Sequence, residues 1–196
     1  MEDKCVFLFA SCLSYGVRGF NRDIIGSYTL RIFESGRVIK SSVESDSMSD
    51  RTIGTFPELA KKVSAIIESH AEAINELKDF YYPGGFSDPA EETFGFGNIR
   101  ISGCNIQRWT DEVIEIIKTT NPDAYEKNKD NIKKVALLLD IYDEIAEVYN
   151  KYVMNTGDRL KTTKPEIKGE MFMCPGLVGS EDLFSWEDIE GCSPFA

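Results

Sequence analysis

The chain has 196 residues, of which 42% are hydrophobic and 28% charged, and these proportions exclude disorder throughout and predict a substantial core. Its formal net charge of −11 disfavours direct binding to nucleic acid and to an anionic membrane, and a basic protein surface is the natural electrostatic partner. No stretch approaches the roughly 18 apolar residues of a membrane helix, and the first apolar run is too short for a signal peptide. Solubility alone also explains an acidic composition in many proteins, so charge by itself does not identify a partner.

Five cysteines are spread along the chain, and no two of them form a CxxC pair: Cys5, Cys12, Cys104, Cys174 and Cys192. An odd number at wide spacing disfavours both a disulfide framework and a zinc knuckle. We therefore expect free thiols and a cytoplasmic protein.

Strand patterns fill the first part of the chain. The apolar run 6–10 predicts a strand that is buried on both faces. Residues 28–33 and 38–43 predict two strands joined by a tight turn, in which Gly36 supplies a positive φ. The polar segment 44–51 predicts a loop.

The first long helix is predicted over residues 55–77. Thr55 and Glu58 have the spacing of a capping box, and apolar residues recur downstream at helical spacing. His70, the one histidine of the chain, lies on this apolar stripe, which favours a structural role over a catalytic one. The Pro-Gly-Gly sequence within 80–86 predicts a loop after the helix.

Residues 94–106 return to a strand pattern whose alternation changes phase at Gly103, which predicts a β-bulge there. Thr110 is the predicted N-cap of the next helix. A further helical stretch follows and is predicted to break near 130–131, and its strongest amphipathic part covers 132–152.

These elements predict the α+β class, with a small, mostly antiparallel sheet of about four strands and several helices packed mainly on one face. Residues 1–168 are expected to form this single domain. Residues 169–196 differ from it because they contain six acidic residues and no Lys or Arg, so they carry −6 of the total charge of −11. We expect this acidic aromatic segment to dock on the domain.

Aromatic residues on loops and beside acidic groups are typical of protein interfaces, although they also serve as lids over a core. Two clusters fit this description, one in the Pro-Gly-Gly loop and one in the acidic segment. The candidate partner-binding residues are Tyr81, Tyr82 and Phe86 in the first cluster, and Glu181, Asp182, Phe184, Trp186, Glu187 and Asp188 in the second.

Carboxylates at i,i+3 spacing on helices offer an alternative, because such pairs can share a magnesium ion. The candidate metal ligands are Glu112, Glu115, Asp140, Asp143, Glu144 and Glu147. With 33 acidic residues in the chain, about five such pairs arise by chance, so a solvated helix face is the stronger interpretation.

A third site is the glycine-containing loop with Arg18 and Arg22, which could hold a small anion, although a connecting loop is the simpler interpretation. The sequence contains no P-loop, HExxH or GxSxG motif, and its GFG tripeptide fails the dinucleotide fingerprint. We therefore expect no cofactor and identify no catalytic residue.

The acidic segment and the lack of catalytic motifs favour a non-enzymatic protein-binding protein over an enzyme. The leading hypothesis is an inhibitor or immunity-type protein that occludes a basic surface of a partner such as a nuclease. A magnesium-dependent hydrolase and a small-anion sensor remain as alternatives. The sequence makes no prediction of oligomeric state.

Overall fold

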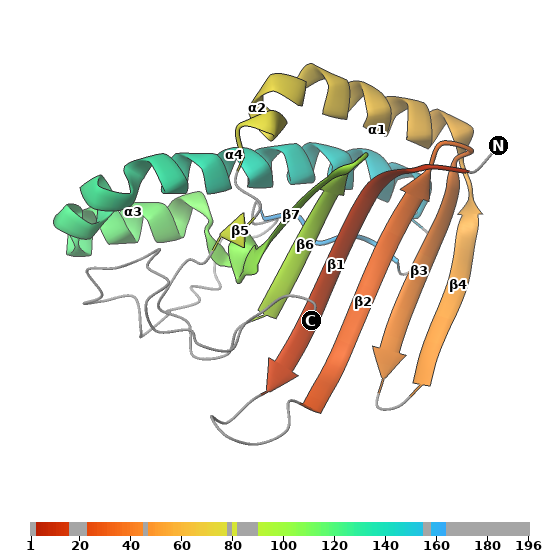
Figure 1. Ribbon diagram of the computed structural model, residues 1–196, viewed down its shortest axis with the longest axis horizontal. Helices are drawn as coiled ribbons and strands as arrows, with labels where there is room; N and C mark the ends of the chain where they lie inside the picture. The colour runs from red at the N-terminus through yellow and green to blue at the C-terminus, as the bar shows by residue number, and fades with distance from the viewer. Residues whose placement is uncertain are drawn as a thin grey trace.

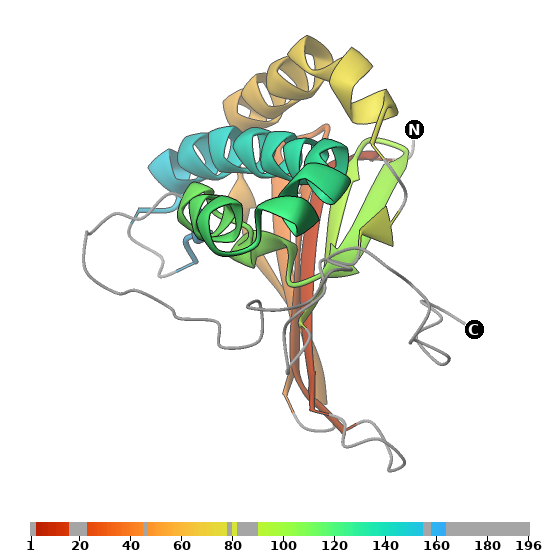
Figure 2. The same cartoon turned by 90° about the vertical axis from the view of Figure 1, so that its left-hand side faces the viewer.

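A single β-sheet carries the described helices on one of its faces (Figures 1 and 2). The structure, a computed structural model, describes residues 3–15, 23–44, 47–77, 80–81, 90–154 and 158–163. In Figure 2 the helices lie on one side of the sheet, and no described helix lies on the other. We call these two surfaces the helix face and the open face.

Seven strands form the sheet in the order β4-β3-β2-β1-β6-β7-β5. Their bounds are β1 Cys5–Tyr15, β2 Asp23–Phe33, β3 Arg37–Glu44, β4 Ser47–Thr55, β5 Phe80–Tyr81, β6 Ala90–Phe96 and β7 Ile99–Cys104. All neighbours pair antiparallel except β5, which is parallel to β7. The predicted α+β class, the mostly antiparallel sheet and the helices on one face are confirmed, and the sheet is larger than the expected four strands.

The predicted loop 44–51 is wrong, because most of it belongs to β4. β4 is an edge strand whose residues 49–52 are all exposed, so it needs no apolar alternation to hold its place. Backbone pairing with β3 holds this polar segment in the sheet. The turn before β3 matches its prediction, since Gly36 has φ of 86° and a side chain there would collide with the backbone of Phe56.

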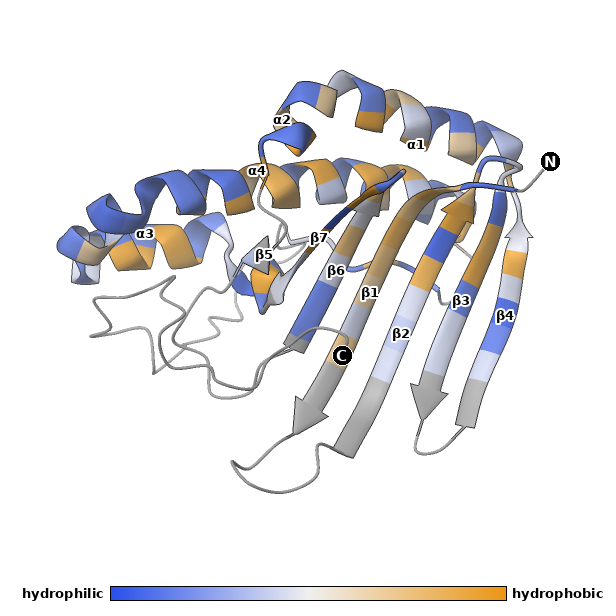
Figure 3. Cartoon of the chain, in the orientation of Figure 1, coloured by the Kyte–Doolittle hydropathy of each residue, from blue (hydrophilic) through white to orange (hydrophobic). Residues whose placement is uncertain are grey.

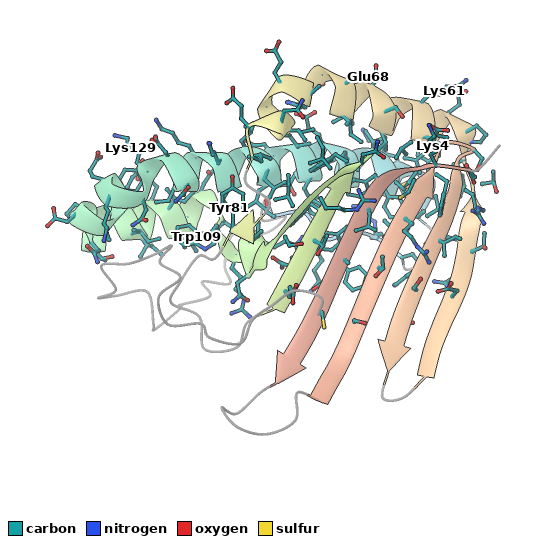
Figure 4. The ribbon with its side chains drawn as sticks, in the orientation of Figure 1. Lys4, Lys61, Glu68, Tyr81, Trp109 and Lys129 are labelled. Atoms are coloured by element: carbon teal, nitrogen blue, oxygen red, sulfur yellow. The ribbon has the colours of Figure 1, made fainter. Side chains whose placement is uncertain are left out.

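Within the described residues, four α-helices and one 3-10 turn cover the helix face: α1 Pro57–Ser69, α2 Ala71–Asn75, η1 Ile106–Arg108, α3 Asp111–Thr120 and α4 Pro122–Tyr152. α1 packs against α4 and β1, and α3 packs against α4. Charged side chains labelled on the outer surfaces of α1 and α4 point to solvent in Figure 4, for example Lys61, Glu68 and Lys129. None of the described helices combines the length and apolarity needed to cross a membrane.

Two features of the first predicted helix are wrong. The helix divides at His70 into α1 and α2. The capping box is absent because Thr55 is the last residue of β4, and the cap position falls to Phe56, which makes no side-chain cap bond. By contrast, the hydroxyl of Thr110 accepts a hydrogen bond from the backbone N–H of Val113, as the predicted cap of α3 requires.

α4 is continuous, so the predicted break at 130–131 is wrong. The side-chain oxygen of Asn121 caps its start by accepting from the backbone N–H of Ala124. Apart from Tyr152, which is half-buried, the predicted apolar face is buried: Ile132, Val135, Leu139, Tyr142, Ile145 and Tyr149. This continuous buried face outweighs the polar residues at the expected break.

Gly103 allows β5 to approach β7 closely, and the predicted β-bulge at this residue is wrong. The pairing of β6 with β7 runs through it without a register shift. A side-chain carbon at this position would lie 2.2 Å from the carbonyl oxygen of Tyr81 on β5. Only glycine therefore lets the short parallel strand β5 approach β7.

Candidate functional site

The helix face of the sheet changes character along its strands. In Figure 3 the upper parts of β1 to β3 are the more hydrophobic ones, and the described parts below them are mostly pale or blue. Register aligns one row of polar residues across five strands: Glu92 on β6, Ser11 on β1, Tyr28 on β2, Ser42 on β3 and Ser49 on β4. We call this set the polar row.

Glu92 is the most deeply buried member of the polar row, at 4% exposed. One carboxylate oxygen accepts a hydrogen bond from the backbone N–H of Gln107 at 3.0 Å. Burial raises the pKa of Glu92 to about 7, against the opposing effect of backbone hydrogen bonds from residues 106–107 and the charge of Arg108. Glu92 therefore exchanges its proton near neutral pH.

The charge of Glu92 influences two tyrosines. Burial raises the pKa of Tyr28 and of Tyr142, and the charge of Glu92 adds to both effects. Both phenols therefore stay protonated at neutral pH. Tyr142 also packs its ring against Phe9 and Phe94, at centroid distances of 4.9 and 5.5 Å.

Residues 158–163, which we call the strap, run antiparallel along α4. Tyr149 donates its hydroxyl to the carbonyl of Asp158 at 3.0 Å, and Tyr142 donates to the carbonyl of Lys161 at 2.9 Å. The side-chain amide of Asn150 both donates to and accepts from the backbone of Leu160, each at 2.9 Å. Side chains of one helix thus bind backbone groups of Asp158, Leu160 and Lys161 in the strap.

Asp143 fixes the end of the strap. Its two carboxylate oxygens accept from the backbone N–H and the hydroxyl of Thr163, at 2.8 and 2.6 Å. Asp143 is 1% exposed, so both bonds are shielded from water. The position of the chain at Thr163, just before the acidic segment, is therefore set by α4.

Asp158 fixes the other end of the strap to the sheet. Its carboxylate accepts from Lys40 on β3 at 3.3 Å and from Arg51 on β4. Burial alone would raise the pKa of Asp158, but the hydrogen bonds and charges of these two bases outweigh it and hold the pKa below its usual value. Asp158 is consequently ionised at neutral pH, and its ion pairs with Lys40 and Arg51 connect the strap to the sheet.

The candidate metal ligands do not converge. Asp143 binds the strap, whereas Glu115 pairs with Lys118 on the exposed side of α3. Glu144 lies 3.3 Å from His70, where the α1–α2 break meets α4. Glu112, Asp140 and Glu147 are exposed. Among the residues that the structure describes, no group of three or more His, Cys, Asp or Glu could hold a metal ion.

Of the candidate partner-binding residues, only Tyr81 falls within the described ranges. It is 2% exposed at β5, in the part of the molecule where Figure 4 also labels Trp109, and it belongs to the core. The following candidates lie outside the described residues: Tyr82, Phe86, Arg18, Arg22, Glu181, Asp182, Phe184, Trp186, Glu187 and Asp188.

Sequence reasoning missed Glu92 and the strap. A signal for Glu92 exists, since Glu92, Phe94 and Phe96 alternate along β6 and so point to the same face. No pattern of comparable strength marks the strap, because its partners lie on α4 and in β3 and β4. No protein-family model matches the sequence, and no curated protein is significantly similar to it.

Proposed function

We propose that the protein is a non-enzymatic inhibitor or immunity-type protein that occludes a basic surface of a protein partner, such as a nuclease. The observation that carries this proposal is the separation of charge along the chain. Residues 169–196 contain six acidic residues and no Lys or Arg, whereas the first 168 residues carry 27 acidic residues against 22 basic ones. Such a segment speeds association with a basic surface and selects against acidic partners.

The strap supports this proposal because it fixes the chain at Thr163, shortly before the acidic segment in the sequence. Asp143 holds Thr163, and the acidic segment begins a few residues further along the chain. A segment anchored at one end loses less entropy on binding than a free one. The fold therefore serves as a rigid base for a charged binding element.

The buried polar groups also fit a binding protein better than an enzyme. Glu92 is occupied by the backbone at η1, and Asp143 and Asp158 are occupied by the strap and by basic side chains. Each of these carboxylates has a structural partner. Among the described acidic residues of α3 and α4, Glu115 pairs with Lys118 and Glu144 lies beside His70, and no group that could hold a metal ion forms. They therefore give no specific support to magnesium chemistry.

The test is quantitative affinity capture from native lysate of the source organism with two variants of equal charge change. The first variant neutralises the acidic segment by Glu181→Gln, Asp182→Asn, Glu187→Gln and Asp188→Asn. The control neutralises helix surfaces by Glu112→Gln, Glu115→Gln, Glu144→Gln and Glu147→Gln.

We expect the wild-type chain and the control to capture the same basic protein, and the segment variant to lose at least about 90% of it. Raising NaCl from about 0.05 to 0.5 M should weaken capture strongly, because exposed charges are screened. If the captured partner is a nuclease, adding the wild-type chain should inhibit it. Equal capture by both variants, or capture indifferent to salt, would refute the proposal.

A further inference from the structure

The two edges of the sheet differ greatly. β5, at one edge, has two residues, whereas β4, at the other, has nine. Among the described elements, none lies beyond β4 (Figure 1). β4 therefore presents a row of backbone N–H and C=O groups that its pairing with β3 leaves free.

Natural proteins usually protect such an edge with lysine, proline or outward charge. Residues Ser47–Thr55 contain no lysine and no proline. The two charged residues of β4 both interact with their own chain, Asp50 with Arg31 at 3.6 Å and Arg51 with Asp158. The outer edge thus carries one exposed charge of each sign, and its pairing with β3 is regular from Ser47 to Thr52, below a bulge at Ile53.

We propose that β4 is the edge to which the basic partner adds an extended strand, so that its backbone continues the sheet. This inference rests on the proposed function, and it identifies where on the described fold the partner docks. Backbone hydrogen bonds along β4 would supply affinity, and side chains on the two faces would supply specificity. The added strand extends the sheet by one antiparallel or parallel neighbour without any change in the fold.

Charge favours the partner over a second copy of this chain. Each copy carries −11, so two copies repel each other, whereas a basic partner is attracted. Antiparallel self-pairing centred on Asp50 or on Arg51 would also place like charges directly opposite each other. Asp50 is 55% exposed despite its contact with Arg31, so it can accept a hydrogen bond from a Lys or Arg on the incoming strand.

The edge strand is linked through Asp158 to the strap, which precedes the acidic segment in the sequence. Arg51 on β4 and Lys40 on β3 both bind Asp158, the first residue of the strap, and the strap leads to the acidic segment. A partner strand on β4 would lie next to this ion pair. The acidic segment would then attract the basic partner, while β4 would set its orientation.

The test compares two threonine-to-lysine variants with the same change of charge. Thr52→Lys places a lysine on the exposed face of β4, where it guards the edge against strand addition. Thr119→Lys places the same charge on the exposed surface of α3. Thermal unfolding of both variants confirms that they fold before capture from native lysate is measured alongside the acidic-segment variant.

We expect Thr52→Lys to lower capture about tenfold or more and Thr119→Lys to leave it within about twofold of the wild type. Hydrogen exchange should show amides of β4 gaining protection in the complex. Unchanged capture by Thr52→Lys, with capture lost in the acidic-segment variant, would overturn the edge proposal and leave the proposed function standing. No capture by the wild-type chain would overturn both, and a wild-type dimer that Thr52→Lys dissociates would identify a second copy as the occupant instead.

Discussion

α4 makes different kinds of contact in the upper and lower parts of the helix face, as these are seen in Figure 3: ring packing in the upper part and hydrogen bonds in the lower part. Above, Tyr142 of α4 packs on Phe9 and Phe94, within the buried apolar layer against which α1 also packs. Below, its side chains donate and accept hydrogen bonds that hold the strap. The comparison teaches that the stability of the fold and the position of the strap depend on different contacts. Apolar burial contributes most of the free energy of folding, whereas directional hydrogen bonds set where the strap lies.

Tyr142 joins the two regions. Its ring packs on Phe9 and Phe94 in the apolar layer, and its hydroxyl binds the strap at Lys161. One side chain therefore connects the apolar core to the strap. Substitutions on either side of Tyr142 should separate the two contributions.

The largest effect is expected in the apolar layer. Phe9→Ala removes a fully buried ring that contacts Tyr28, Phe94 and Tyr142. We expect the free energy of unfolding to fall by about 3–5 kcal/mol, because the cavity cannot be refilled by rigid strands. Urea denaturation followed by circular dichroism measures this loss.

Leu8→Ala is the matched control, because Leu8 is the neighbouring residue on the open face and is only half-buried. Its cost should stay below about 1.5 kcal/mol. Equal costs for the two substitutions would mean that the two faces of β1 are equally packed.

The second prediction concerns Glu92 and pH. With a folded pKa of about 7 against an ordinary value of 4.5, Glu92 keeps its proton in the folded protein while the unfolded chain loses it. Its contribution to stability is therefore full below pH 4.5 and is lost as pH rises towards about 7. Glu92→Gln should remove this dependence and raise stability by about 2–3 kcal/mol at pH 8 relative to its effect at pH 4.5.

Urea denaturation at several pH values, with Glu91→Gln as control, measures this difference. Glu91 is the adjacent residue on β6 and is only half-buried. If the difference in unfolding free energy between the wild type and Glu92→Gln is the same at every pH, burial does not raise the pKa of Glu92.

The smallest effect is expected at the strap. Asp143→Ala removes both bonds to Thr163 and should cost about 1–3 kcal/mol, and it should also speed tryptic cleavage after Arg159 and Lys161. Asp140→Ala, an exposed change one turn earlier in α4, should cost less than about 0.5 kcal/mol. Unchanged cleavage in Asp143→Ala would show that the other strap contacts suffice.

The parts of the fold that local physics determines were predictable from the sequence. Thr110 caps α3, Gly36 forms its turn, and the apolar face of α4 is buried as its periodicity indicates. β4 was missed because an edge strand exposed on both faces has no apolar period, and its pairing with β3 is a tertiary property. The class of the fold therefore followed from the sequence, while the extent of the sheet did not.

The site was less predictable for the same reason. Asp143 has the sequence signature of a metal-binding helix pair, but its partner is Thr163, which no helical spacing reveals. Tyr81 has the composition of an exposed loop, but Gly103 allows it to approach β7 and join the core. Both outcomes depend on contacts between segments that are distant in sequence.

The order of the strands has a consequence for biosynthesis. β1 to β4 form consecutive hairpins, so they can pair as soon as they leave the ribosome. β1 must then wait for β6 to complete its second pairing, and the apolar layer must wait for α4 at residues Pro122–Tyr152. Until α4 is synthesised, Phe7, Phe9, Leu30 and Ile32 have no helix to cover them, so the nascent meander is expected to be more prone to aggregation than the finished fold.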